Sequence, residues 1–118
     1  MSKPRIKLEA VIDSVAHANT IISSIESRLV GKDIFQDKNL TVSETDDEPR
    51  KPLIIFDCRF NSRIDRDDVK TWLRGQIKDH PVVKTWIESV KLTTHLCTHD
   101  DVSVKDCKTT EYVMEFNR

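Results

Sequence analysis

The chain has 118 residues, with 19 lysines and arginines against 20 aspartates and glutamates, so its net charge is −1. This length suits one domain, 1–118, with one modest core. The charge balance offers no general attraction to nucleic acid or to an anionic membrane, so we expect neither as a partner. MSKPRIKLEA lacks the apolar segment of a signal peptide and no apolar run would span a membrane, which predicts a soluble, non-exported protein.

The chain has three cysteines, an odd number and too few for a disulfide scaffold. They are Cys58, Cys97 and Cys107. Such sparse cysteine usage is typical of proteins in a reducing compartment, and we therefore expect the thiols to be reduced.

The first apolar pattern predicts one long N-terminal helix over 5–30. Leu8, Val15, Ile22 and Leu29 recur every seven residues, with Val11, Ala18 and Ile25 as a second series. Pro4 suits the first helical turn and Gly31 suits the residue after the last one. The apolar seam of this helix packs either on the domain's own sheet or partly against another subunit.

The next segment, 32–52, is polar and contains the acidic run Asp46, Asp47 and Glu48. It predicts a flexible acidic loop or arm, with Asn39–Glu44 as a short edge strand. We expect the acidic run to be solvated surface or to meet a partner protein.

Leu53–Phe60, LIIFDCRF, is the clearest strand. Ile54, Phe56, Cys58 and Phe60 alternate with residues that turn polar toward the end of the segment. This pattern predicts a sheet with one face only partly covered.

A broken helix pair is predicted over 65–90. Asp65 suits an N-cap, and Pro81 interrupts the apolar pattern because proline lacks an N–H donor. The tetrapeptide VKTW occurs on both sides of the break, at Val69–Trp72 and Val83–Trp86. We expect both tryptophans to anchor the core, the alternative being a tryptophan at a subunit contact.

The C-terminal part alternates as two strands should. VKLTTHLCT and TTEYVMEF predict a β-hairpin, and a turn centred on Val102 is the register that places Cys107 opposite Cys97. Taken together, the elements predict an α+β domain with a small, mainly antiparallel sheet and helices packed on it.

The stretch HLCTHDD raises the possibility of a metal site. His95, Cys97 and His99 would share one face of a strand, and Cys107 would lie across the hairpin. These are zinc-ligand types, but their spacing matches no familiar zinc pattern. The alternatives are a Cys97–Cys107 disulfide and a plain solvated strand, and we expect the solvated strand and no metal.

Basic side chains gather around the junction of the strand and the following helix. They are Arg59, Arg63, Arg66, Lys70 and Arg74, interleaved with Asp57, Asp65, Asp67 and Asp68. The carboxylates cancel most of the positive field, which favours a protein contact over a phosphate site. No catalytic motif occurs, so we expect a protein that is not an enzyme and needs no cofactor.

The order of the segments RIKLEAVIDSVAHANTIISSIESRLV, LIIFDCRF, DRDDVKTWLRGQIKDHPVVKTWIESV and VKLTTHLCT with TTEYVMEF resembles that of bacteriophage tail-terminator or tail-completion proteins. This resemblance implies a non-enzymatic structural subunit of the virion or host cytoplasm. It implies a homo-oligomer, typically a six-membered ring, that meets the tail tube and the head connector. The family usually has more strands before the segment that corresponds to LIIFDCRF.

Two other functions remain open. One is a small inhibitor or adaptor that binds a host protein, which predicts a monomer or dimer. The other is a metal- or nucleic-acid-binding module that uses the histidine–cysteine strand or the basic cluster.

Overall fold

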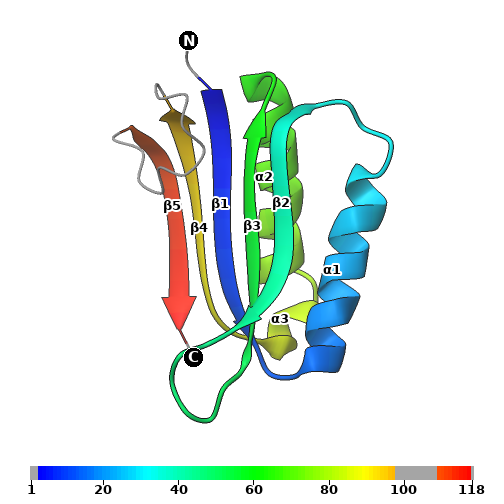
Figure 1. The fold of residues 1–118 in the computed structure, drawn as a ribbon, viewed down its shortest axis with the longest axis vertical. Helices are drawn as coiled ribbons and strands as arrows, with labels where there is room; N and C mark the ends of the chain where they lie inside the picture. The colour runs from blue at the N-terminus through cyan, green and yellow to red at the C-terminus, as the bar shows by residue number, and fades with distance from the viewer. Residues whose placement is uncertain (1–2, 98–108, 118) are drawn as a thin grey trace.

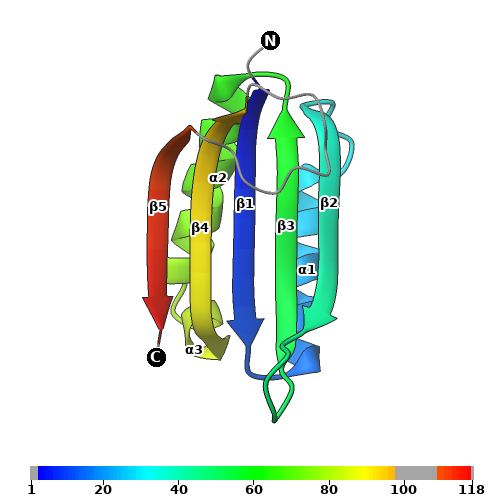
Figure 2. The same cartoon turned by 60° about the vertical axis from the view of Figure 1, so that its left-hand side comes forward.

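The computed structural model describes residues 3–97 and 109–117, which form one antiparallel sheet with helices on one face. The elements are β1 (Lys3–Ile12), α1 (Val15–Leu29), β2 (Phe35–Glu44), β3 (Pro52–Phe60), α2 (Arg63–Lys78), α3 (Val83–Trp86), β4 (Ile87–Cys97) and β5 (Thr110–Asn117). The strand order is β2-β3-β1-β4-β5, and α1 and α2 lie on the same side of the sheet (Figure 1). We call this side the helix face and the other side the open face (Figure 2). The predicted α+β class is confirmed.

The predicted long N-terminal helix is wrong in its first third. Residues 3–12 form the central strand β1, paired antiparallel with both β3 and β4. Ile6, Leu8, Ala10 and Ile12 are buried on the helix face, a period of two that the seven-residue pattern had concealed. The helix starts only at Val15, where the Ser14 hydroxyl caps it by accepting a hydrogen bond from the His17 N–H.

The apolar seam of α1 belongs mostly to the core of the domain. Ala18, Ile25 and Leu29 are buried against the sheet, whereas Val15, which the pattern assigned to the same seam, is 62% exposed. Gly31 follows the helix with φ of 75°, a conformation that glycine adopts without strain.

Segment 32–52 contains a strand that is longer than expected. The predicted edge strand Asn39–Glu44 is present and extends back to Phe35, so the acidic loop is limited to 45–51. β2 pairs antiparallel with β3 and is one of the two edge strands of the sheet.

Strand β3 has the predicted orientation. Ile54, Phe56, Cys58 and Phe60 are fully buried on the helix face and form the centre of the core together with β1. Leu53, Ile55 and Asp57 are half-buried on the open face.

The helix pair predicted over 65–90 is shorter in the structure. α2 begins at Arg63 because Ser62, and not Asp65, is the N-cap: the Ser62 hydroxyl accepts a hydrogen bond from the Asp65 N–H. α3 consists of only four residues, the second VKTW, and the chain enters β4 at Ile87.

The two tryptophans pack against the core without being enclosed by it. Trp72 in α2 and Trp86 in α3 are both half-buried neighbours of the buried cluster. Trp86 also stacks on His17, with ring centroids 4.1 Å apart and planes within 6°. The Arg28 guanidinium lies over the Trp72 ring at 5.8 Å. Each tryptophan therefore packs against the core, as predicted, and also contacts a residue of α1 at the surface.

Strands β4 and β5 form the predicted antiparallel pair, while the expected turn at Val102 lies outside the described residues. Tyr112 and Phe116 pack from β5 onto the core, and Met114 is buried in it. In the described ranges, none of the helices has the length and apolar character needed to span a membrane.

Candidate functional site

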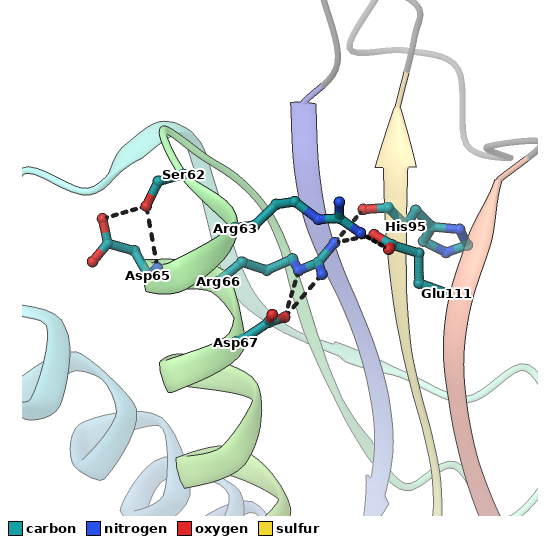
Figure 3. Close-up of polar contacts among 7 residues, drawn as sticks. All are labelled: Ser62, Arg63, Asp65, Arg66, Asp67, His95 and Glu111. Atoms are coloured by element: carbon teal, nitrogen blue, oxygen red, sulfur yellow. Dashed lines mark hydrogen bonds and ion pairs between the residues drawn. The ribbon is translucent and has the colours of Figure 1, made fainter.

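The basic junction predicted from the sequence contains a closed set of ion pairs, which we call the Arg66 cluster: Arg63, Arg66, Asp67 and Glu111 (Figure 3). Arg66 projects from the first turns of α2 and is only 3% exposed. Its Nη1 donates to the His95 carbonyl at 2.9 Å and to Glu111 Oε1 at 2.7 Å. Its Nε and Nη2 donate to Asp67 Oδ1 at 3.0 and 2.8 Å. One guanidinium therefore ties α2 to β4 and β5.

Glu111 reaches Arg66 because β5 is irregular at this point. The β4–β5 ladder pairs Thr94 with Tyr112 but His95 with Thr110, so Glu111 is the extra residue of a bulge. Its carboxylate accepts from Arg66 and from Arg63, which is itself exposed. Two guanidinium groups and two carboxylates neutralise one another here. The cluster is thus a structural clamp, with no excess charge to attract phosphate.

The hydrogen bond from Arg66 is the main reason why the pKa of Glu111 lies below its ordinary value of 4.5. Partial burial opposes this effect, and the nearby charges of Arg66 and Arg63 reinforce it. A carboxylate with a lowered folded-state pKa contributes stability that is present above the unfolded-state pKa. This contribution is lost as the pH falls through the folded-state pKa.

We therefore expect the stability difference between wild type and Glu111→Gln to depend on pH. The difference should be constant above about pH 5 and should shrink as the solution is made more acidic. Urea unfolding at a series of pH values measures it. A difference that stayed constant down to about pH 3 would show that Glu111 ionisation is not coupled to folding.

The other predicted basic residues do not join this cluster. Arg59 lies on the open face, buried, with its guanidinium bound to Asp37 at 2.7 Å. Lys70 lies over the Tyr112 ring at 4.8 Å, and Arg74 is exposed further along α2. Sequence reasoning missed the partners Glu111 and Asp37, because each lies more than twenty residues away from its arginine and no local pattern connects them.

A second buried arginine lies beside Arg59 on the open face. Arg5 donates through Nε and Nη2 to the two carboxylate oxygens of Asp57, both at 2.7 Å. This two-pronged geometry is the strong form of an arginine–carboxylate pair. The arginines of the open face are thus also neutralised.

The described part of the proposed metal strand does not offer metal ligands. The ring nitrogens of His95 lie 3.1 Å from the Thr93 hydroxyl and 3.2 Å from the Thr110 hydroxyl. Cys97 is disulfide-bonded, so the expectation of reduced thiols is wrong for this residue. His99 and Cys107 lie outside the described residues. His95 and Cys97 share the open face as predicted, yet both are buried, so the solvated-strand interpretation is wrong for them.

Within 3–97 and 109–117, no group of three histidine, cysteine or acidic side chains could hold a metal ion. Cys58 is a free thiol, but it is fully buried, and burial is the main cause that raises its pKa to about 12. It is therefore protonated at neutral pH and unsuited to nucleophilic chemistry.

A groove of about 350 Å³ crosses β1, β4 and β5 on the open face. Its lining carries both signs of charge, with Lys7 and Lys91 near Glu9 and Glu115. The ladders place Lys91 opposite Glu9 on one side and Glu115 on the other, so the charges alternate across the strands. Such a surface is stabilising for the sheet and presents no converging charge for a ligand.

An exposed apolar surface lies at one edge of the sheet; we call it the β2 edge surface and define it as the outer edge of β2 with Val15 and Val42. Both valines line a groove of about 550 Å³ that also includes Asp46 and Arg50 of the acidic loop. Val15 is 62% and Val42 is 41% exposed. Of the predicted acidic contacts, Asp46 borders this groove, Asp47 is exposed beside it, and Glu48 pairs with Arg50 at 3.3 Å.

No protein-family model and no curated protein matches the chain. Two solved structures are similar in fold. One is a dimeric ferredoxin-like protein from an uncultured marine organism, with a TM-score of 0.52 and 11% identity; the likeness covers 86% of this chain and all of that one. The other is a phage SAM lyase in complex with S-methyl-5′-thioadenosine, with a TM-score of 0.52 and 10% identity; it covers 98% of this chain and 90% of that one. At these identities the comparisons show a common fold and nothing about activity.

Proposed function

We propose that this protein is a non-enzymatic subunit that assembles with copies of itself through the β2 edge surface. The observation that carries the proposal is a ten-residue edge strand whose side chains, apart from Phe35 and Leu40, are exposed, with an exposed valine in the strand, Val42, and another beside it, Val15. An edge strand presents a row of N–H and C=O groups that a strand from another chain is able to pair with. Exposed apolar side chains next to such an edge are typical of a protein contact.

The electrostatics of the described residues favour assembly over catalysis. The buried arginines Arg5, Arg59 and Arg66 each bind a carboxylate, and Cys58, the free thiol within 3–97 and 109–117, is protonated at neutral pH. Active sites in contrast bring together titratable groups that are poised to exchange protons. The phage SAM lyase, with its similar fold, makes the enzyme alternative testable: the proposal predicts no S-methyl-5′-thioadenosine when this protein is incubated with SAM.

The dimeric neighbour supports the choice of partner, because a protein of this fold associates with a second copy. The narrower proposal, a tail-terminator ring of six subunits in a phage virion, belongs to the same class and rests on the element order. That order differs at the N-terminus, where β1 precedes α1. Tail tube and connector proteins would be the further partners of such a ring.

Mass in solution tests the proposal directly. We expect light scattering after size exclusion to give a discrete dimer or a larger closed oligomer. A strict monomer up to about 100 μM, well above the Kd of specific interfaces, would overturn self-assembly. That result would favour the adaptor or inhibitor function, in which the same edge binds a different protein.

A further inference from the structure

The part of β2 from Lys38 to Glu44 is a regular strand whose outer edge pairs with no strand in the described part of the chain. The register with β3 runs without interruption over this part, and the only irregularity lies between Phe35 and Asp37. Within the described residues β3 is the sole strand that pairs with β2. The strand contains no proline, so each residue keeps its N–H group.

The register also assigns each side chain to a face of the sheet. Lys38, Leu40, Val42 and Glu44 lie opposite Cys58, Phe56, Ile54 and Pro52, and therefore point to the helix face. Asn39, Thr41 and Ser43 point to the open face. Along the strand, the helix face thus reads positive, apolar, apolar, negative.

This order of side chains allows the strand to pair favourably with an antiparallel copy of itself. In an antiparallel pair of two β2 strands related by a two-fold axis at Thr41, Lys38 lies opposite the partner's Glu44 and Leu40 opposite the partner's Val42. Each pair occurs twice by symmetry. On the open face Asn39 meets the partner's Ser43 and Thr41 meets the partner's Thr41, so polar groups also face polar groups.

Other two-fold registers lose this match. An axis at Asn39 places Lys38 against the partner's Leu40, and an axis at Ser43 places Val42 against the partner's Glu44. An axis at Leu40 or Val42 likewise opposes a charged residue to an apolar one. Registers displaced by an odd step would place helix-face residues opposite open-face residues, so that the two helix layers would lie on different sides.

We infer that two copies of this chain pair through β2 about a two-fold axis at Thr41. The pairing forms one continuous sheet to which each copy contributes its five strands. The inference rests on the proposed self-assembly and specifies its partner and register. Val15 of α1, which lines a groove together with Val42 and is 62% exposed, extends the covered surface beyond the strand pairing. The Glu44–Arg50 pair at 3.6 Å is exposed and contributes little, so Glu44 is able to exchange Arg50 for the partner's Lys38.

Charge exchange across the interface tests the register. Lys38→Glu and Glu44→Lys should each weaken dimerisation about tenfold, because either change places like charges opposite each other twice. The double variant restores opposite charges and should return to within about threefold of wild type. Analytical ultracentrifugation measures the dissociation constants, and circular dichroism checks that each variant is folded.

Cross-linking gives a second measurement that does not depend on charge. Thr41→Cys should form an intermolecular disulfide under mild oxidation, because the two residues face each other. Ser43→Cys, on the same strand and face, should not, since the register separates the two copies of Ser43 by about 13 Å along the strands. Wild type is the background control, because Cys58, the free thiol among the described residues, is fully buried.

The outcomes separate the two proposals. A monomeric wild-type protein overturns self-assembly itself. If the protein is an oligomer, but neither charge reversal changes its dissociation constant and Thr41→Cys forms no intermolecular disulfide, the β2 register is overturned. Self-assembly then stands and takes place through another surface.

Discussion

Arg66→Met is expected to lower the free energy of unfolding by about 3 kcal/mol. The change removes the guanidinium that links α2 to the His95 carbonyl and to Glu111, and it deprives Asp67 and Glu111 of their hydrogen bonds from Arg66. Removing one member of a buried ion pair typically costs about 3–5 kcal/mol. The low end applies because Arg63 continues to bind Glu111.

The matched control is Arg63→Met. Arg63 binds the same carboxylate, but its side chain is 57% exposed, so its removal should cost less than about 1 kcal/mol. Chemical denaturation of both variants measures the two losses. Equal losses for the two arginines would show that the clamp depends on charge and not on the burial of Arg66.

Phe56→Ala should have the largest effect, a loss of about 3–5 kcal/mol. Phe56 is fully buried on the helix face and lies between Leu8 of β1 and Leu40 of β2 in the two flanking ladders. Truncation removes an aromatic ring from the centre of the core and leaves a cavity that the surrounding strands are too constrained to fill.

The neighbouring residue provides the control. Ile55 lies one position earlier on the open face and is only half-buried, so Ile55→Ala should cost clearly less than Phe56→Ala. Thermal or urea unfolding of the two variants compares the faces of one strand. A larger loss at Ile55 would mean that the open face is covered to an extent that the described residues do not show.

The contacts of Arg66 and Phe56 also matter for the proposed assembly, because they hold the sheet together before a second copy binds. The Arg66 cluster ties α2 to β4 and β5, and β2 is paired along its length with β3, whose residues form the centre of the core. A preformed edge strand binds at a lower entropic cost than a segment that must first become ordered. We therefore expect β2 to be ordered before a second copy binds.

Several elements were predictable because their signal is local. Alternation over Leu53–Phe60 predicted β3 and the residues that it buries, since a period of two assigns each side chain to a face whatever lies beyond it. Pro81 predicted the break between the two VKTW segments, because the loss of an N–H group acts at the residue itself. The segments TTEYVMEF and VKLTTHLCT predicted the paired strands β4 and β5.

The N-terminal segment shows where local signals fail. Leu8 and Val11 continue the seven-residue series of α1, but Ile6, Leu8, Ala10 and Ile12 also alternate, and the alternation is the pattern that the fold uses. Pairing with β3 on one side and β4 on the other stabilises residues 3–12 as a strand. Neither partner is near in sequence, so a short-range pattern could not choose between the two periods.

The order of side chains along this chain determined the α+β class, the buried face of β3, the helical break and the self-complementary pattern of β2, because each depends on spacing alone. Only the tertiary structure decided that β1 is a strand at the centre of the sheet, that Arg66 and Arg59 are neutralised by Glu111 and Asp37, and that the edge strand β2 extends back to Phe35. Those features depend on which distant segments meet, and the pairing of distant segments is a property of the whole sheet that no single stretch of sequence contains.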